Sequence, residues 1–129
     1  EGLYRERAEQ ALQSAKRFVD RAPSACSSTL IALDFLLQGG VEIAIVGGGD
    51  GEGQKRLLQA IHSGFVPRRV IAVAPENVSE SYSTVVPLLE GKRASESKAT
   101  AFVCRDFACR EPTTNPEVLA RQLVEAFGG

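Results

Sequence analysis

Two short runs, Val41-Glu42-Ile43-Ala44-Ile45-Val46 and Arg69-Val70-Ile71-Ala72-Val73-Ala74, decide the fold of this chain. Both are rich in β-branched residues and the first is ended by glycine, which is the pattern of a strand buried on both faces of a sheet. Between them, residues 52–62 carry their leucine and isoleucine side chains on one helical face, with lysine, arginine and glutamine opposite. Residues 41–74 therefore predict a strand-helix-strand unit with parallel strands and a right-handed crossover.

The segments after this unit predict one more strand and two helices. A short helix is expected over 84–90, with Pro87 in its first turns, and a third strand over 99–104. A last helix follows the capping sequence Thr114-Asn115-Pro116-Glu117. The connecting segments are expected to be irregular: 92–98 and 105–112. The expected fold class is α/β, with a small parallel or mixed three-stranded sheet flanked by helices, in a domain that covers residues 40–129.

The first part of the chain predicts a helical hairpin. Apolar residues recur at three- and four-residue steps from Tyr4 to Val19, which gives a helix of about five turns with one apolar stripe that we expect to be buried. Pro23 disfavours helical geometry in the residue before it, so a second helix follows and runs to about Gln38. This second helix is apolar on more than one face. Residues 1–39 are therefore predicted to form a helical hairpin that precedes the α/β domain.

Composition limits the partners and the compartment of the chain. The 129 residues carry 15 basic and 16 acidic side chains, so that neither nucleic acid nor an anionic membrane surface is an expected partner. No apolar run approaches the roughly 20 residues of a membrane-spanning helix. The chain contains no methionine and no signal-type stretch at its start, and we expect it to be a piece of a larger protein. Its three cysteines show no repeated spacing, which favours a reducing, cytoplasmic location.

The sequence Gly47-Gly48-Gly49-Asp50-Gly51-Glu52-Gly53 lies between the first strand and its helix, where backbone amides can hold a phosphate. The dinucleotide fingerprint fails because Glu52 occupies its third glycine position. The phosphate-loop pattern fails because Gln54 stands where lysine is needed and Lys55 stands where serine or threonine is needed. We interpret the run chiefly as a flexible strand-to-helix turn. The alternative is an anion-binding loop formed by Gly47, Gly48, Gly49 and Gly51.

Cys104 and Cys109 flank the sequence Arg-Asp-Phe-Ala after the third strand. A redox dithiol of the thioredoxin type places its cysteines three residues apart at a helix start, and that arrangement is absent. We favour the interpretation that both are buried or half-buried thiols, since free cysteine packs as a small hydrophobe. The alternative is a pair of candidate redox thiols, which can form a bridge if residues 105–108 bend back and bring the Cα atoms within roughly 7 Å.

No complete catalytic or metal-binding set is visible in the sequence. A structural zinc site needs about four ligands, and beyond Cys104 and Cys109 the chain offers only Cys26 and a lone His62. His62 has no neighbouring serine, aspartate or cysteine motif that indicates a nucleophilic triad, and we expect a packed or solvated histidine. We therefore expect no metal and no cofactor, and we do not expect this chain to be an enzyme by itself.

Several segments in order resemble the carboxy-terminal end of the thioredoxin-domain-containing, spermatogenesis-associated protein family. The similarity spans nearly the whole chain and depends on the order and spacing of its pieces. Phe102 stands where the family often has tyrosine, and the glycine run after Gly47 is richer than in the family pattern. The segments that carry the resemblance are Arg21-Ala22-Pro23, Ala32-Leu33-Asp34-Phe35-Leu36, Glu42-Ile43-Ala44-Ile45-Val46-Gly47, Pro87-Leu88-Leu89-Glu90-Gly91-Lys92 and Lys98-Ala99-Thr100-Ala101-Phe102-Val103-Cys104, followed by Cys109, Pro112, Thr114 and Pro116.

The resemblance implies a place in a larger protein and no substrate. Family members have an amino-terminal thioredoxin-like domain, a central helical toroid similar to sugar epimerases and six-hairpin glycosidases, and an α/β tail. Residues 1–39 would be the last hairpin of the toroid and residues 40–129 the tail. The leading hypothesis is a non-catalytic accessory module that packs against the remainder of its parent polypeptide. The rival hypotheses are a phosphate- or nucleotide-binding domain that uses the glycine run, and a thiol-redox role for Cys104 and Cys109.

Overall fold

The computed structural model, which describes residues 2–49, 51–76, 80–106 and 108–128, contains the predicted strand-helix-strand unit. Strand β1 (Val41–Val46) pairs in parallel with β2 (Arg69–Ala74), so that Val41 lies opposite Arg69 and Val46 opposite Ala74. Helix α3 (Glu52–Ser63) connects the two strands. The prediction of two parallel strands joined by a helix is confirmed, and the fold class is α/β.

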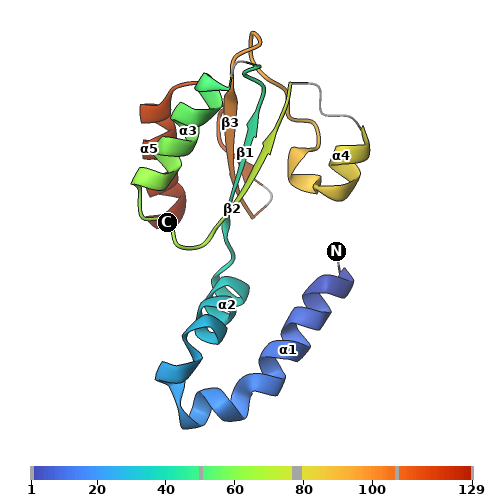
Figure 1. The fold of residues 1–129 in the computed structure, drawn as a ribbon, viewed down its shortest axis with the longest axis vertical. Helices are drawn as coiled ribbons and strands as arrows, with labels where there is room; N and C mark the ends of the chain where they lie inside the picture. Colours follow the sequence, from blue (N-terminus) through green and yellow to red (C-terminus); the bar gives the residue numbers. More distant parts are fainter. Residues whose placement is uncertain (1, 50, 77–79, 107, 129) are drawn as a thin grey trace. The chain divides into compact units, whose positions relative to one another are not determined.

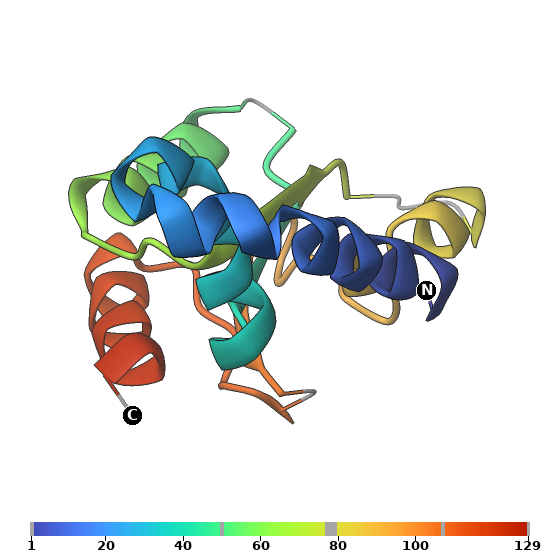
Figure 2. The same cartoon turned by 90° about the horizontal axis from the view of Figure 1, so that it is seen from below.

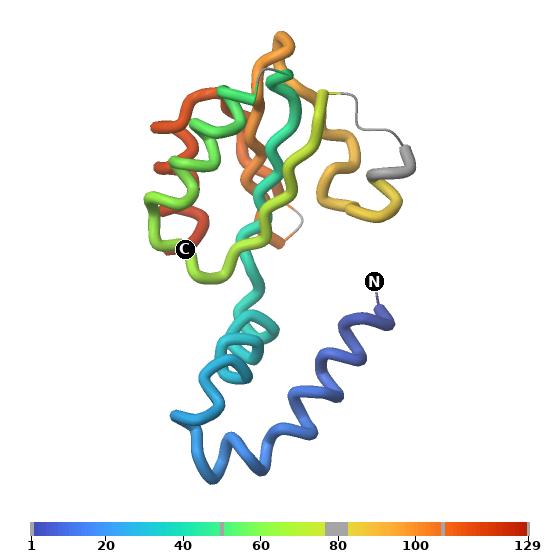
Figure 3. The backbone as a smooth tube through the Cα atoms, in the orientation of Figure 1, coloured from blue at the N-terminus to red at the C-terminus, as the bar shows by residue number. Residues whose placement is uncertain are grey.

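The sheet is mixed and has four strands in the order β2-β1-β3-β4. Strand β3 (Thr100–Arg105) runs antiparallel to β1, with Val103 opposite Ile43. The backbone trace in Figure 3 shows β1 between β2 and β3. The prediction of three strands and of an irregular segment over 105–112 is wrong, because Ala108–Cys109 forms a short strand, β4, antiparallel to β3. Two residues without a β-branched side chain carry too little pattern to be recognised as a strand.

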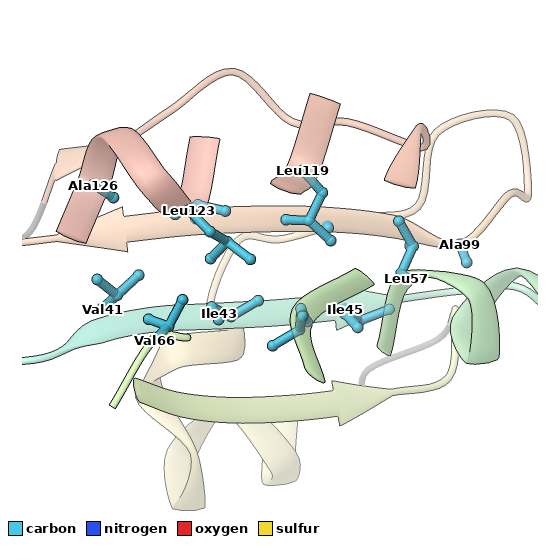
Figure 4. Close-up of a cluster of buried hydrophobic side chains, with 12 residues drawn as sticks. Val41, Ile43, Ile45, Leu57, Val66, Ala99, Leu119, Leu123 and Ala126 are labelled. Atoms are coloured by element: carbon cyan, nitrogen blue, oxygen red, sulfur yellow. The ribbon is translucent and has the colours of Figure 1, made fainter. Parts of the chain in front are cut away.

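The sheet is covered by helices on both faces. Helices α3 and α5 lie on one face and α4 lies on the other, as Figures 1 and 2 show. The first face carries alternate residues of β1, which pack with the apolar stripes of α3 and α5 (Figure 4). The second face carries Ala44 and Val46 of β1, which pack with Ala74 and Leu89. A strand covered on both sides needs apolar residues at nearly every position, which is why β1 is apolar at every position except Glu42. The prediction that the second run is also buried on both faces is wrong, because β2 lies at an edge of the sheet and its Val70 and Val73 are 45% and 44% exposed.

The segment before β3 differs from the prediction of one helix over 84–90. The structure has a short helix α4 (Glu80–Val85) and a separate 3₁₀ helix η2 (Pro87–Leu89). Val86 between them has φ −124° and ψ 84°, outside the helical region. The cause is Pro87, because the proline ring disfavours helical geometry in the preceding residue. The proline therefore separates two short helices instead of lying within the first turns of one.

Helix α5 (Pro116–Gly128) begins as predicted, with Asn115 as the capping residue. The side-chain oxygen of Asn115 accepts hydrogen bonds from the backbone N–H of Glu117 at 2.8 Å and of Val118 at 3.4 Å. Pro116 occupies the first helical position, where its missing N–H costs nothing. The stripe of α5 supplies three buried residues of the first face: Leu119, Leu123 and Ala126.

The chain divides into two compact units, Glu1–Gly39 and Gly40–Gly129. The first unit consists of α1 (Gly2–Arg21), the 3₁₀ helix η1 (Pro23–Cys26) and α2 (Ser27–Gln38). A helical hairpin is therefore confirmed, although the second helix starts with a 3₁₀ turn after Pro23. The expected burial of the apolar stripe is not observed, because none of the described residues of α1, η1 or α2 is buried. No helix in the described part of the chain has the length and apolar content to cross a membrane.

Candidate functional site

The glycine turn between β1 and α3 lies at the carboxyl ends of β1 and β2. Gly47, Gly48 and Gly51 have φ values of 86°, 75° and 75°, in the left-handed region that favours glycine. Gln54, in the first turn of α3, donates from Nε2 to the carbonyl oxygen of Gly47 at 2.6 Å and to that of Ala74 at 3.3 Å. The residue that breaks the phosphate-loop pattern therefore ties β1 to β2. Asp50, one of the two acidic residues of the run, lies outside the described residues.

Close packing explains part of the glycine content of this turn. A Cβ at Gly48 would lie 2.8 Å from the Cβ of Ala99, and one at Gly53 would lie 2.9 Å from the same atom. A Cβ at Gly47 would overlap the Cβ of Ala94. A Cβ at Gly49 meets nothing within 4 Å, and Gly49 has no positive φ. The packing of the segment before β3 therefore requires glycine at three positions, and it leaves Gly49 without a structural explanation.

A shallow depression of about 320 Å³ lies beside the turn, at the amino-terminal end of α3. Two cationic side chains, Arg56 and Lys98, and two hydroxyl-bearing residues, Ser97 and Thr114, line it together with the glycine backbone. The Nζ of Lys98 lies 2.9 Å from Oε2 of Glu96. The pKa of the Glu96 carboxyl lies below its ordinary value of 4.5, mainly because of this hydrogen bond and secondly because of the positive charge of Lys98. The depression thus combines a helix N-terminus with two cations, one of them paired with a carboxylate.

The tight turn over residues 95–98 presents part of this lining. The backbone N–H of Lys98 donates to the carbonyl oxygen of Ser95 at 2.8 Å, and the two residues between them, Glu96 and Ser97, have φ of 49° and 55°. Such turns normally carry asparagine or glycine, and each non-glycine residue in this region costs on the order of 1 kcal/mol. The hydroxyl of Ser97 donates to Oε1 of Glu76 at 2.9 Å. The backbone is therefore strained where it holds Ser97 and Lys98 against the depression.

Cys104 and Cys109 lie opposite each other on β3 and β4 and are joined by a disulfide. Their Cα atoms are 3.9 Å apart. Cys104 is buried, with 3% of its surface exposed, whereas Cys109 is exposed on an edge strand. The preference for free thiols in the sequence analysis is therefore wrong for this pair. The antiparallel pairing of β3 with β4, which the sequence did not predict, is what brings the two side chains together.

The arginine next to each of these cysteines reaches the last turn of α5. Arg105 donates from Nη1 to the carbonyl oxygen of Ala126 at 2.5 Å, and Arg110 donates from Nη1 to Oε2 of Glu125 at 2.6 Å. Carbonyl groups at a helix C-terminus lack intrahelical donors, so cationic side chains stabilise this end. Sequence reasoning did not find these two contacts. The only signal was an arginine beside each cysteine.

The remaining candidates form no site in the described residues. His62 is exposed, with Nδ1 3.3 Å from Nη2 of Arg69, which agrees with a solvated histidine. Cys26, in η1, is a free thiol in the helical unit. Within residues 2–49, 51–76, 80–106 and 108–128, no group of three or more histidine, cysteine, aspartate or glutamate side chains is arranged to hold a metal ion.

These features define a small α/β domain with a mixed four-stranded sheet, accompanied by a helical hairpin. The chain is 34% identical to spermatogenesis-associated protein 20 of Homo sapiens, and 32% identical to the proteins of that name from Rattus norvegicus and Mus musculus. Each match covers 103 residues, which is 80% of this chain and 13% of the relative. The resemblance to the spermatogenesis-associated protein family is thereby confirmed. No family model and no solved structure matches the chain.

Proposed function

We propose that this chain is a non-catalytic accessory module that packs against the remainder of a longer polypeptide. The observation that carries the proposal is a helical unit without a buried residue: none of the described residues of α1, η1 and α2 is buried. Large apolar side chains are exposed along it, including Tyr4 at 82%, Phe18 at 71% and Ile31 at 68%. A unit that folds by itself in water rarely leaves so many large apolar side chains exposed, and such surfaces mark docking sites.

The energetics favour docking. Burying one large apolar side chain stabilises by about 1.5–3 kcal/mol, so a handful of them exceeds what a short helical hairpin gains by itself. In the relatives, the remainder of the polypeptide is large enough to be such a partner, because the matched segment is 13% of their length. By the family resemblance, that partner includes a thioredoxin-like domain and a helical toroid of which residues 1–39 are the last hairpin. Exposed apolar residues on both α1 and α2 suit a hairpin with neighbours on several sides. We also propose a cytoplasmic location for the parent protein.

Hydrogen exchange read by mass spectrometry tests this proposal. The 129-residue chain is compared with the longer polypeptide that contains it, and exchange is followed in two segments, 2–38 and 41–46. We expect 2–38 to exchange within seconds in the shorter chain and to be protected in the longer one, with 41–46 protected in both. Equal protection of 2–38 in both proteins would mean that the hairpin needs no further partner, and the proposal would be withdrawn.

A matched pair of variants in the longer polypeptide tests the surface itself. Phe18→Ser removes a large apolar side chain from α1, and Arg17→Ser changes the exposed residue beside it. We expect the Phe18 variant to lose protection over 2–38 and the Arg17 variant to keep it. If both variants lose protection equally, the loss does not come from an apolar docking surface, and this part of the proposal is contradicted.

A second candidate function is anion binding at the glycine turn, which we propose on the lining of the adjacent depression. Arg56 and Lys98 face the depression together with the backbone of Gly49, the one glycine of the turn that packing and backbone geometry do not require. A phosphate group would accept hydrogen bonds from this backbone and pair with the two cations. The alternative of a purely structural turn is favoured by the close contacts at Gly48 and Gly53.

A thermal-shift titration with inorganic phosphate and with ATP tests anion binding. Ligand at one hundred times its Kd stabilises by about 2.7 kcal/mol, which raises the melting temperature of a domain of this size by roughly 10 °C or more. Arg56→Gln should remove the shift, whereas Arg121→Gln, an exposed arginine of α5, should leave it unchanged. The absence of a shift at millimolar phosphate and ATP would exclude this function.

A further inference from the structure

We propose that the Cys104–Cys109 disulfide is a reversible thiol-disulfide exchange site whose reduction releases the C-terminal end of α5. The bond connects a buried residue on β3 to an exposed residue on β4, an edge strand of the sheet. The proposal goes beyond the accessory role and does not depend on it. The reactant class is a dithiol, either a small molecule or a side-chain pair of another protein.

The exposure of the two cysteines sets the direction of the reaction. A thiolate of the dithiol attacks Sγ of Cys109, because Cys109 is exposed while 3% of Cys104 is accessible. A bond forms between the attacking sulfur and Cys109, and Sγ of Cys104 leaves with the electron pair and takes up a proton. The second thiol of the reagent then displaces Cys109 from the mixed disulfide. The cystine gains two electrons and two protons, and the dithiol becomes a disulfide.

Contacts made by β3 and by the residue after β4 couple this bond to α5. Arg105 follows Cys104 and donates to the carbonyl oxygen of Ala126, and Arg110 follows Cys109 and pairs with Glu125. The backbone N–H of Arg110 also donates to the carbonyl oxygen of Val103 at 2.9 Å. An open depression of about 470 Å³ lies between strands β3 and β4 and this end of α5. The residues on either side of the bond therefore hold the last turn of the helix.

Without the covalent link, β4 is a weak element. It has two residues and lies at the edge of the sheet, and so short a pairing is marginal in water. When β4 separates from β3, Arg110 loses the position from which it reaches Glu125. Ala126 is buried in the main core, so loosening this end of α5 also opens that core. The redox state of the pair thus controls how firmly one end of α5 is held.

The direction of attack is tested with alkylation rates in the 129-residue chain carrying Cys26→Ser. Cys104→Ser leaves the Cys109 thiol, and Cys109→Ser leaves the Cys104 thiol. We expect the Cys109 thiol to react with iodoacetamide at least about tenfold faster than the Cys104 thiol. Equal rates would overturn the assignment of Cys109 as the attacked sulfur. If either variant fails to fold, trapping the mixed disulfide with glutathione in the Cys26→Ser chain locates the attacked sulfur by mass spectrometry.

The coupling is tested by hydrogen exchange with and without dithiothreitol. We expect reduction to be complete and reversible in the folded chain, and to accelerate exchange at the end of α5 about fivefold or more without changing α3. Arg110→Gln should loosen the same turn in the oxidised chain, and Arg121→Gln should not. A disulfide that reacts with dithiothreitol only after unfolding would overturn the exchange site. Identical exchange in the two redox states would overturn the coupling.

Discussion

Gly53 is the position where two physical effects oppose each other, and its replacement by alanine decides between them. Gly53 lies in the first turn of α3, where alanine is a better helix former than glycine by up to about 1 kcal/mol. The new Cβ would, however, lie 2.9 Å from the Cβ of Ala99. That methyl group is attached to the backbone and has no rotamer through which it can move away.

The close contact should outweigh the helix propensity. Forcing an extra methyl group into a packed site costs about 1–3 kcal/mol, so we expect Gly53→Ala to destabilise by about 1 kcal/mol after the gain in propensity. In a chain that also carries Ala99→Gly the contact is absent, and the same change should stabilise by about 1 kcal/mol. The two backgrounds should therefore differ by about 2 kcal/mol.

Amide exchange in β1 measures this difference for the α/β unit alone. The amides of Ile43 and Ile45 lie in the centre of the sheet and exchange through unfolding of the unit, so 1 kcal/mol changes their rate about fivefold. Gly49→Ala is the control, because its Cβ would meet nothing within 4 Å. If Gly53→Ala slows exchange equally in both backgrounds, the close contact with Ala99 carries no energy and the packing explanation of the glycine turn is refuted.

Three further outcomes are expected. Asn115→Ala removes the acceptor at the start of α5 and should lower the free energy of unfolding by about 1 kcal/mol in urea denaturation. Gln54→Leu leaves the ends of β1 and β2 without their shared donor and should cost about 1–3 kcal/mol in the same assay. An NMR titration should give Glu96 a pKa below 4.5 that returns toward 4.5 in Lys98→Met. Because this pKa is lowered in the folded state, the ion pair stabilises above about pH 4.5 and its contribution is lost as the pH falls through the lowered value.

The two parallel strands could be predicted from the sequence because their pattern is local. The runs at 41–46 and 69–74 carry apolar side chains at nearly every position, and the structure has both strands with those bounds. The start of α5 was equally visible, since the cap and the proline are adjacent in the chain. Local chemistry of this kind does not depend on what the rest of the fold does.

The elements that were missed depend on neighbours distant in sequence or on a competing local effect. β4 exists because β3 provides a partner for Ala108 and Cys109, and its residues have no strand pattern of their own. The disulfide follows from that pairing. Because the sequence predicts an irregular segment over 105–112, it also favours free thiols at Cys104 and Cys109. The single helix predicted over 84–90 does not form because Pro87 keeps Val86 out of the helical region and so divides the segment into two short helices.

In the candidate site too, features set by the local sequence could be predicted, and features that depend on residues distant in sequence could not. The glycine turn was located correctly by its place between a strand and a helix, but the role of Gln54 could not be read from a motif that requires lysine at its position. Its role requires knowing that the end of β2 lies within reach, which is a property of the sheet. Whether the turn binds an anion stays a prediction, as does the redox activity of Cys104 and Cys109.

The central position of β1 has a consequence for how the α/β unit assembles. Both strands that flank β1 come later in the chain, and its antiparallel partner places Val103 opposite Ile43. During synthesis β1 therefore leaves the ribosome as an apolar segment with no sheet to join, and the core closes only after α5 has followed. Pairings this far apart in sequence fold slowly, because the intervening chain must be ordered first. The nascent chain thus exposes its most deeply buried strand for the longest time, and β1 is where a chaperone would be needed first.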